Sequence, residues 1–314
     1  MACWVFSGCG DVRVFDVPIG KNVEPPDSLS IFYTCDTRGH INPCNCTAGV
    51  AGGLARRKTF ISQLQQGDSL IVDVGNNTAG VRDWELLELE YILRGYDAIG
   101  YDAVNIGARE AGLPATKLKA LATRYPFLVS ANIQDASGAS IFPAYQVVTM
   151  KSGYRAAVIG VVDDTLLPDE IGEGVKIVPP EQAIAAVLPK AKAEADIVTL
   201  LAFADEQAMK SLADQFYEIA VMIGGDVEQP SGEPVTANKS TLVYVTDKGK
   251  SVGKLDLRYV GGQYVAEKNV ITMLMENIAD DAKIAALVNE LYQKQVENNY
   301  PTKKDDEDGL TRVN

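Results

Sequence analysis

Residues 28–40, "SLSIFYTCDTRGH", hold the strongest fold signal in the chain. The first seven are mostly apolar, β-branched or aromatic, which predicts a buried strand. The next six are small or polar and include Asp36, Arg38 and His40, the chain's single histidine. Functional side chains of open α/β sheets gather where strands end. The segment therefore predicts a strand of a layered sheet that leads directly into a site.

The same pattern continues along the chain, where apolar runs alternate with helix-period segments. Strands are predicted over residues 28–34, 69–75, 103–107, 127–133, 145–150, 154–163, 196–203, 217–225, 241–247 and 253–260. Helices are predicted over 51–66, 83–95, 115–124, 180–194 and 205–215. Near-continuous apolar strands are typical of sheets covered on both faces, and the alternation favours an α/β fold. The close spacing of the later strands indicates an antiparallel portion.

The domain organisation follows from the ends of this pattern. Residues 28–275 read as one domain, since neither an internal repeat nor a flexible linker interrupts them. Residues 1–27 form a cysteine-containing extension, and 276–300 contain an amphipathic helix with acidic residues near its start. Acidic residues there are favoured by the helix dipole. Residues 301–314 are predicted to be a polar tail.

Charge and hydropathy restrict the classes of partner. The formal net charge is -13 and the pI is near 4.6, which argues against a nucleic-acid or anionic-membrane surface. No apolar run reaches the roughly 18 residues of a spanning helix. "FSGC" (6–9) loosely resembles a lipoprotein cleavage box, with Cys9 as the lipidated residue. The alternative is an ordinary N-terminal strand with two buried thiols.

All five cysteines lie within the first 46 residues. Such clustering indicates a local device: a metal site, a reactive dithiol or local disulfides. Cys35, His40, Cys44 and Cys46 supply donors that suit zinc, copper or an iron–sulfur cluster, although their spacing matches no standard finger. Cys44 and Cys46 alternatively form a strained, redox-active disulfide or serve as small loop residues. We expect these four side chains to approach one another.

The order of short motifs along the chain resembles a known family. The motifs are "YTCDTRGH" (33–40), "GGLARR" (52–57), "DVGN" (73–76), "GYDAVNIGARE" (100–110), "VSANI" (129–133), "LLAF" (200–203) and "IGGDVE" (223–228). In this order they resemble the metallophosphoesterase domain of the periplasmic 5′-nucleotidase family, the UshA-like proteins, from about residue 28 to 275. The resemblance implies two mixed sheets flanked by helices and an extracytoplasmic location.

The resemblance also identifies positions that hold two metal ions in the family, through Asp, His, Asp, Asn and three further His residues. Carried over to this chain, the metal-ligand positions are Asp36, Arg38, Asn76, Ala108, Phe203, Asp226 and Glu228, and Arg109 stands at the position of the family's catalytic histidine. Arginine cannot ligate a metal, and alanine and phenylalanine offer no donor. A two-metal centre needs ligands that fix both ions and a group that bridges them. We therefore predict that hydrolytic activity is lost.

Arginine–carboxylate pairing is the expected replacement for the metals. Arg38 and Arg109 are predicted to pair with Asp36, Asp226 or Glu228, since arginine forms strong bonds to carboxylates. The alternative is that the two arginines bind a phosphate or another anion. Arg56 and Arg57, in the "GGLARR" helix start, are predicted to be solvated or paired.

Three functions are consistent with these residues. The first is a non-hydrolytic member of the fold with a soft-metal or redox site at the Cys/His segment and an unidentified redox partner. The second is a binding or assembly protein without chemistry. The third is a residual phosphoesterase with a single hard cation. Resemblance of fold does not choose among them.

Overall fold

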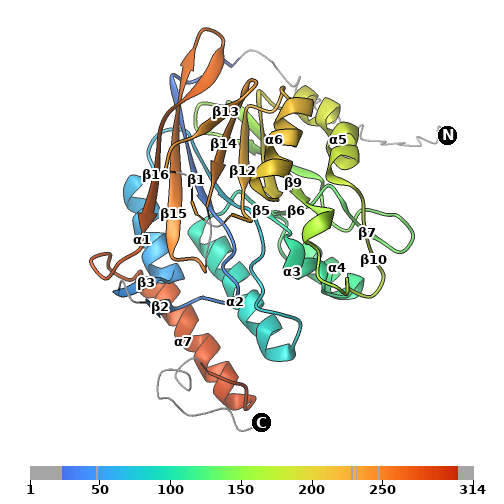
Figure 1. Cartoon of the computed structure of the whole chain (residues 1–314). Helices are drawn as coiled ribbons and strands as arrows, with labels where there is room; N and C mark the ends of the chain where they lie inside the picture. Colours follow the sequence, from blue (N-terminus) through green and yellow to red (C-terminus); the bar gives the residue numbers. More distant parts are fainter. Residues whose placement is uncertain (1–22, 47–48, 228, 231, 246–247, 303–314) are drawn as a thin grey trace, which may run out of the picture.

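The computed structural model describes residues 23–46, 49–227, 229–230, 232–245 and 248–302. Two six-stranded sheets pack together and carry helices on their outer sides (Figure 1). The main core cluster joins apolar residues of both sheets, including Ile31, Val72, Val158, Leu201 and Val243. The predicted extension over 1–27, with Cys9, lies mostly outside the described residues, as does most of the tail.

The first sheet is mixed and has the order β16-β15-β1-β4-β5-β6. Its parallel strands are β1 (Ser28–Thr34), β4 (Ser69–Asp73), β5 (Ala103–Asn105) and β6 (Leu128–Val129). Its antiparallel strands are β15 (Ser251–Val260) and β16 (Gln263–Met273). The carboxyl ends of the four parallel strands therefore meet at one edge.

The second sheet is also mixed and has the order β13-β14-β12-β11-β9-β8. Its parallel strands are β9 (Arg155–Val162), β11 (Ile197–Phe203), β12 (Val221–Gly224) and β14 (Ser240–Tyr244). The antiparallel edge strands are β8 (Tyr145–Thr149) and β13 (Val235–Ala237). All seven residues of β11 are buried, as its continuous apolar sequence predicts.

Seven α-helices and two small strand pairs complete the part of the chain that the structure describes. The helices are α1 (Leu54–Leu64), α2 (Asp83–Ile99), α3 (Ala108–Ala111), α4 (Ala115–Arg124), α5 (Pro180–Glu194), α6 (Glu206–Gln215) and α7 (Ala282–Glu297). β2 (Pro43–Cys46) pairs with β3 (Gly49–Gly52), and β7 (Ile133–Asp135) pairs with β10 (Val175–Ile177). A short 3-10 helix, η1, spans Asp164–Leu166. The layered α/β prediction is confirmed.

One predicted strand differs from the structure, and one long observed strand was not predicted. Residues 127–133 are not one strand, because the chain leaves the first sheet after β6 and forms β7 in a separate pair. The buried Asn132 causes the departure: its Nδ2 donates to the carbonyl oxygens of Val162 (2.7 Å) and Val178 (3.0 Å). β16, the longest strand described, was not predicted, because its polar, half-exposed residues do not show the apolar run of a buried strand.

Asparagine side chains also tie the two sheets together. Asn105, at the end of β5, is buried and donates to the carbonyl oxygens of Val74 (3.0 Å) and Val161 (2.7 Å). Val74 follows a strand of the first sheet, and Val161 lies on β9 of the second. Each buried amide thus satisfies backbone groups that a water molecule would otherwise have to reach.

The predicted amphipathic helix is α7, which packs against α1 and α2. Ile284 and Leu291 are buried on it, and Asp281 caps its start by accepting from the backbone nitrogens of Lys283 and Ile284 (both 3.0 Å). None of the helices that the structure describes has the length and apolar content to cross a membrane.

Candidate functional site

The predicted site lies at the carboxyl ends of β1, β4 and β5, and its backbone is unusual. Asp36, Arg38 and Asn76 have φ angles of 60°, 46° and 65°, in the left-handed region that residues other than glycine seldom adopt. The strand-end loops hold one another in this form: Asp36 N donates to Gly75 O (2.8 Å) and Arg38 N donates to Asn76 O (3.3 Å). Backbone strain of this kind clusters at functional sites.

Asp36 is the buried centre of the site. Its Oδ1 accepts from Arg38 Nε and from Asn76 Nδ2, both at 2.6 Å. Burial raises the pKa of Asp36, and the bonds from Arg38 and Asn76 oppose that rise. The side chain of Arg38 remains 34% exposed. The predicted Arg38–Asp36 pair is confirmed.

Asn76 connects the three loops. Its Nδ2 donates to Asp36 and its Oδ1 accepts from the backbone nitrogen of Arg109 (2.8 Å). The guanidinium of Arg109 is exposed and donates to Ala79 O (2.9 Å). No ion pair joins Arg109 to Asp36 or Asp226 in the described structure. Among the described residues, the Arg109 guanidinium bonds a backbone carbonyl instead, and the predicted pairing of Arg109 with one of the three acids stays a prediction.

The other predicted positions lie around this cluster. Ala108 begins α3 and Phe203 ends β11, and both are buried among apolar neighbours. Asp226 follows β12 and is half-buried, with its backbone nitrogen donating to Ala204 O (3.3 Å). Glu228 lies outside the described residues, so its predicted pairing stays a prediction.

A buried carboxylate that the sequence analysis did not identify holds the loops after β4 and β5 together. Glu110 is 3% exposed and accepts four backbone N–H bonds, from Asn76 (2.9 Å), Asn77 (2.6 Å), Thr78 (2.7 Å) and Gly107 (2.9 Å). Burial raises its pKa, and these four bonds lower it. The spacing from Gly107 to Glu110, an N-cap followed three residues later by Glu, is the signal that identifies such a residue.

Asp73 is a second missed carboxylate, at the end of β4. Its Oδ1 accepts from Gly75 N and Asn77 Nδ2 (both 2.8 Å). Its Oδ2 accepts from Thr34 Oγ1 (2.6 Å) and Tyr96 OH (3.1 Å). Asp73 is fully buried, so these four donors take the place of the water that it loses.

Arg57 supplies the positive charge next to this network. It is fully buried, and its Nη1 donates to Tyr96 OH (3.0 Å) and Tyr101 OH (3.2 Å). Its Nη2 donates to Thr37 Oγ1 (3.3 Å). The Tyr96 and Tyr101 rings stack at 4.2 Å between centroids. Arg57 is thus paired, as expected, but with tyrosine and threonine hydroxyls in the core.

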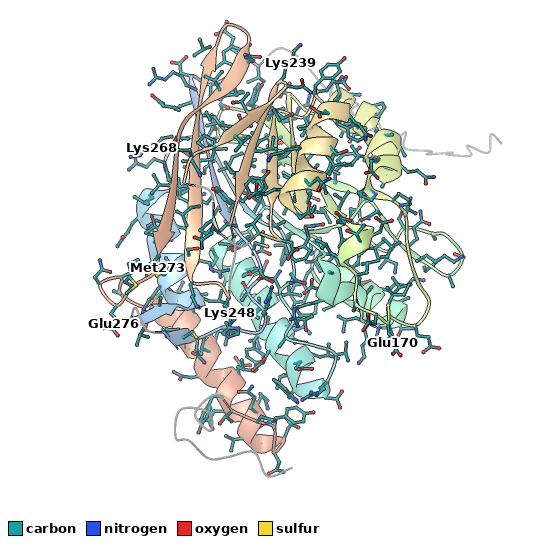
Figure 2. The ribbon with its side chains drawn as sticks, viewed as in Figure 1. Glu170, Lys239, Lys248, Lys268, Met273 and Glu276 are labelled. Atoms are coloured by element: carbon teal, nitrogen blue, oxygen red, sulfur yellow. The ribbon has the colours of Figure 1, made fainter. Side chains whose placement is uncertain are left out.

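One loop reaches this site from the region between β14 and β15. The backbone nitrogen of Lys248 donates to Asp36 O (2.9 Å), and Lys248 has a φ of 55°. Figure 2 shows Lys248 below the ends of the central strands, on the side of the molecule where the site lies. The backbone of this loop therefore closes against the loop that carries Asp36.

Cys35 lies in the core beneath the site. Its exposed fraction is 2%, and its Sγ contacts Gly75 O at 3.7 Å. Burial raises the pKa of the Cys35 thiol well above its usual range; Asp36, Asp73 and Glu110 raise it further, and Arg38 lowers it less. Arg38 thus lowers the pKa of this thiol, but burial and the three carboxylates raise it by more.

The remaining members of the Cys/His segment lie on separate local elements. His40 Nδ1 is 2.8 Å from Arg38 O, and Cys44 is half-buried on β2, opposite Ala51 of β3. Cys46 pairs through its backbone with Gly49, while its side chain is outside the described part. Among described residues, no three His, Cys, Asp or Glu side chains form a group suited to a metal ion. The structure thus does not gather Cys35, His40 and Cys44 as ligands.

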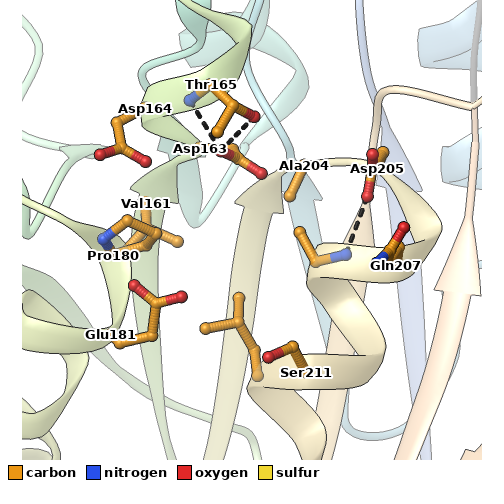
Figure 3. Close-up of a pocket in the computed structure, with 12 residues that line it drawn as sticks. Val161, Asp163, Asp164, Thr165, Pro180, Glu181, Ala204, Asp205, Gln207 and Ser211 are labelled. Atoms are coloured by element: carbon orange, nitrogen blue, oxygen red, sulfur yellow. Dashed lines mark hydrogen bonds between the residues drawn. The ribbon is translucent and has the colours of Figure 1, made fainter.

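A separate cavity of about 280 Å³ lies at the carboxyl ends of β9 and β11 (Figure 3). Asp163, Asp164, Glu181 and Asp205 line it, and no basic side chain does. Asp163 Oδ1 accepts from Thr165 N (2.8 Å) and Oγ1 (2.7 Å), and Asp205 caps α6 through Ala208 N (2.8 Å). Two of its four acids therefore cap helices, and none of the predicted site residues lines it.

Comparisons with known proteins show which sequences and folds this chain is similar to. No family model matches the chain. It is 28% identical over 256 residues to a 5′-nucleotidase of Vibrio cholerae, across 67% of this chain and 46% of that protein. It is 32% identical over 145 residues to protein UshA of Salmonella pullorum, across 43% of this chain and 26% of that protein. The chain thus matches less than half the length of either relative.

Solved structures show the same fold. A 5′-nucleotidase precursor from Thermus thermophilus matches with a TM-score of 0.73 at 20% identity, over 86% of this chain and 59% of that one. The calcineurin-like phosphoesterase YfkN from Bacillus subtilis matches with a TM-score of 0.70 at 22% identity, over 87% of this chain and 99% of that one. This chain therefore has the metallophosphoesterase fold, and its sequence is similar to those of UshA-like 5′-nucleotidases.

Proposed function

We propose that this chain is a non-hydrolytic member of its family whose strand-end site binds a small anion of the phosphate class. The observation that carries the loss of hydrolysis is the bonding of Asp36. Its Oδ1 accepts from Arg38 Nε and Asn76 Nδ2 at 2.6 Å each. Two N–H groups thus occupy one of the two oxygens through which Asp36 could ligate a cation.

Asn76 is equally unsuited to the role of a bridge between two ions. Its Nδ2 is a donor, and its Oδ1 already accepts from the backbone nitrogen of Arg109 (2.8 Å). Ala108 and Phe203 offer no ligand atom, and two ions need a bridging group as well as terminal ligands. These side chains therefore do not fit the dinuclear metal centre that the family implies.

The guanidinium groups support the binding part of the proposal. Arg38 is one-third exposed and Arg109 is exposed, and both belong to one network through Asp36 and Asn76. Arginine presents paired donors that match the oxygens of phosphate and carboxylate.

Two assays test the proposal. Hydrolysis of 5′-AMP and p-nitrophenyl phosphate with added Mg²⁺, Mn²⁺ or Zn²⁺ should equal that of an Asp36→Ala control. Calorimetric titration with inorganic phosphate should show binding that Arg109→Ala weakens by about tenfold, as expected for loss of a charge-assisted bond. Arg258→Ala is the matched control, since that arginine is exposed on β15. Turnover abolished by Asp36→Ala would refute the first part, and phosphate binding insensitive to Arg109 would refute the second.

The second candidate function is redox or soft-metal chemistry on the hairpin of β2 and β3. Its support is the half-burial of Cys44 on β2, two residues before Cys46. The buried, high-pKa Cys35 is not expected to take part. Thiol counting with and without a chelator tests it: one or two masked thiols, released by chelator or reductant, would support it. Rapid reaction of both hairpin thiols in the untreated protein would count against it.

The UshA-like relatives also support an extracytoplasmic location.

A further inference from the structure

A cavity of about 420 Å³ lies at the end of the molecule opposite the candidate site. It is bounded by the residues that precede β11 and β12, and by the turn between β15 and β16. We name it the tyrosine pocket, because Tyr154, Tyr217, Tyr259 and Tyr264 line it. Figure 2 shows Lys239, another lining residue, beside the turn of this hairpin, far from Lys248 at the site.

Two of the four rings form a fixed floor. Tyr154 and Tyr264 are 6% and 9% exposed. Their hydroxyls donate to Asp196 O (3.3 Å) and Pro26 O (2.9 Å). Tyr264 packs edge-on against Tyr154 (5.9 Å between centroids) and Tyr259 (5.2 Å). The edge-on contacts and the hydrogen-bonded hydroxyls restrict the motion of these rings. The floor of the pocket is therefore preorganised for a ligand.

The rim is formed by a ring that faces solvent. Tyr217 is 51% exposed, an unusual state for a large aromatic side chain. The Lys239 ammonium lies 5.5 Å from the centre of the Tyr217 ring. Rigid aromatic surfaces that remain exposed beside a concave floor are the usual anchors of binding sites.

The charges of the pocket already have partners within the protein. Lys192 forms an ion pair with Glu218. Asp196 Oδ2 accepts from the backbone nitrogen of Arg155 (2.8 Å) and lies 3.7 Å from its Nε. Two lysines and two acids line the pocket, so it carries no net charge. A charged ligand would therefore meet no excess of opposite charge, which favours a neutral one.

We propose that the tyrosine pocket binds a neutral oligosaccharide. The apolar C–H face of a pyranose ring suits the exposed ring of Tyr217, beside the half-buried ring of Tyr259. Its hydroxyls both donate and accept, and the rim offers both kinds of partner in Glu218, Lys192 and the amide of Gln263. The volume falls within the range of small-molecule sites. This inference is independent of the proposed anion site at the other end.

The proposal is tested by titrating the full chain with maltotriose, cellotriose and chitotriose. NMR saturation transfer and calorimetry detect the binding. At least one sugar should bind saturably below ~10 mM. Tyr217→Ala should weaken that binding by about tenfold, because it removes the rim's stacking surface. Gln263→Ala should weaken it less. Tyr300→Ala is the control, since Tyr300 is half-buried beyond the end of α7 and lies away from the pocket.

Tyr217 and Gln263 are both exposed, so neither substitution should unfold the protein, and circular dichroism checks this. The proposal is overturned if none of the three sugars saturates. It is also overturned if binding is unchanged in both Tyr217→Ala and Gln263→Ala. A pocket that takes the neutral nucleoside adenosine but none of the sugars would show that the rings stack on a base, which contradicts the ligand class proposed.

Discussion

The two halves of the candidate site differ in how they satisfy their polar groups. On the first sheet, the buried carboxylates of Asp36, Asp73 and Glu110 each accept two or more hydrogen bonds from the protein itself. On the second sheet, the corresponding strand ends carry the apolar Phe203 and the half-buried Asp226. The first half therefore satisfies its carboxylates within the protein, whereas the described strand ends of the second half present one apolar side chain and one half-buried acid.

The largest effect on stability is expected at Glu110, whose carboxylate holds the loops of the first half together. Glu110→Ala leaves four buried backbone N–H groups without an acceptor. We expect the free energy of unfolding to fall by about 3–5 kcal/mol, since unsatisfied buried donors are costly. Urea unfolding measures this change. Asp164→Ala, an exposed acid at the second half, is the control and should change stability by less than about 0.5 kcal/mol. Equal effects would remove the distinction between the halves.

Asp102 provides a contrast to these carboxylates, because it accepts few hydrogen bonds from the protein. It accepts one backbone bond, from Ile71 N (2.8 Å), and burial raises its pKa to about 6. Between its ordinary pKa near 4 and this value, the folded state binds the proton more strongly than the unfolded state. Stability should therefore fall as pH rises from about 4 to about 6, by roughly 3 kcal/mol. Asp102→Asn should remove this decline in urea unfolding measured across that range; an unchanged slope would contradict the assignment.

Arg38 tests how far Asp36 depends on its arginine. Arg38→Ala leaves Asp36 with the single donor Asn76 Nδ2. Because Arg38 is 34% exposed, solvent screens the pair, and we expect a loss of about 1 kcal/mol. The pKa of Asp36 should rise further, since one of the bonds that oppose its rise is gone. Carboxyl chemical shifts in an NMR titration report the pKa, and a fall would disprove the pairing.

The smallest expected effect is at Asp205, in the acid-lined cavity at the strand ends of the second sheet. Its side chain caps α6 by accepting from Ala208 N (2.8 Å). Asp205→Ala should lower the free energy of unfolding by about 1 kcal/mol or less, the usual cost of a lost N-cap. Asp205→Asn, which retains a capping oxygen, should cost only a few tenths. A loss comparable to that of Glu110→Ala would mean that the second half is as interdependent as the first.

The sequence predicted most of what apolar periodicity controls. Six helices and ten of the twelve strands in the two sheets follow from periodic patterns. The Arg38–Asp36 pair follows instead from the resemblance, which places an arginine beside a carboxylate at two of the family's metal positions. Periodicity does not reveal a strand such as β16, whose half-exposed residues are polar, nor the break inside 127–133, which depends on bonds from Asn132 to distant backbone groups.

The interior of the site was less predictable for the same reason. Arg57 is buried because two tyrosines and a threonine, far apart in the sequence, present hydroxyls to it. The state of Cys35 depends on three carboxylates brought to it by the loops after β1, β4 and β5. Long-range contacts of this kind leave no local pattern, whereas the spacing from Gly107 to Glu110 is local and was open to detection.

The asparagines that tie the sheets together have a mechanical consequence. Asn105 bonds a carbonyl that follows β4 and another on β9, and Asn132 bonds the last residue of β9. Separation of the two sheets would expose these amides together with the carbonyls that they satisfy. The sheets should therefore open as one cooperative unit, and the amide hydrogens of β5 and β9 should exchange with solvent at the same opening free energy.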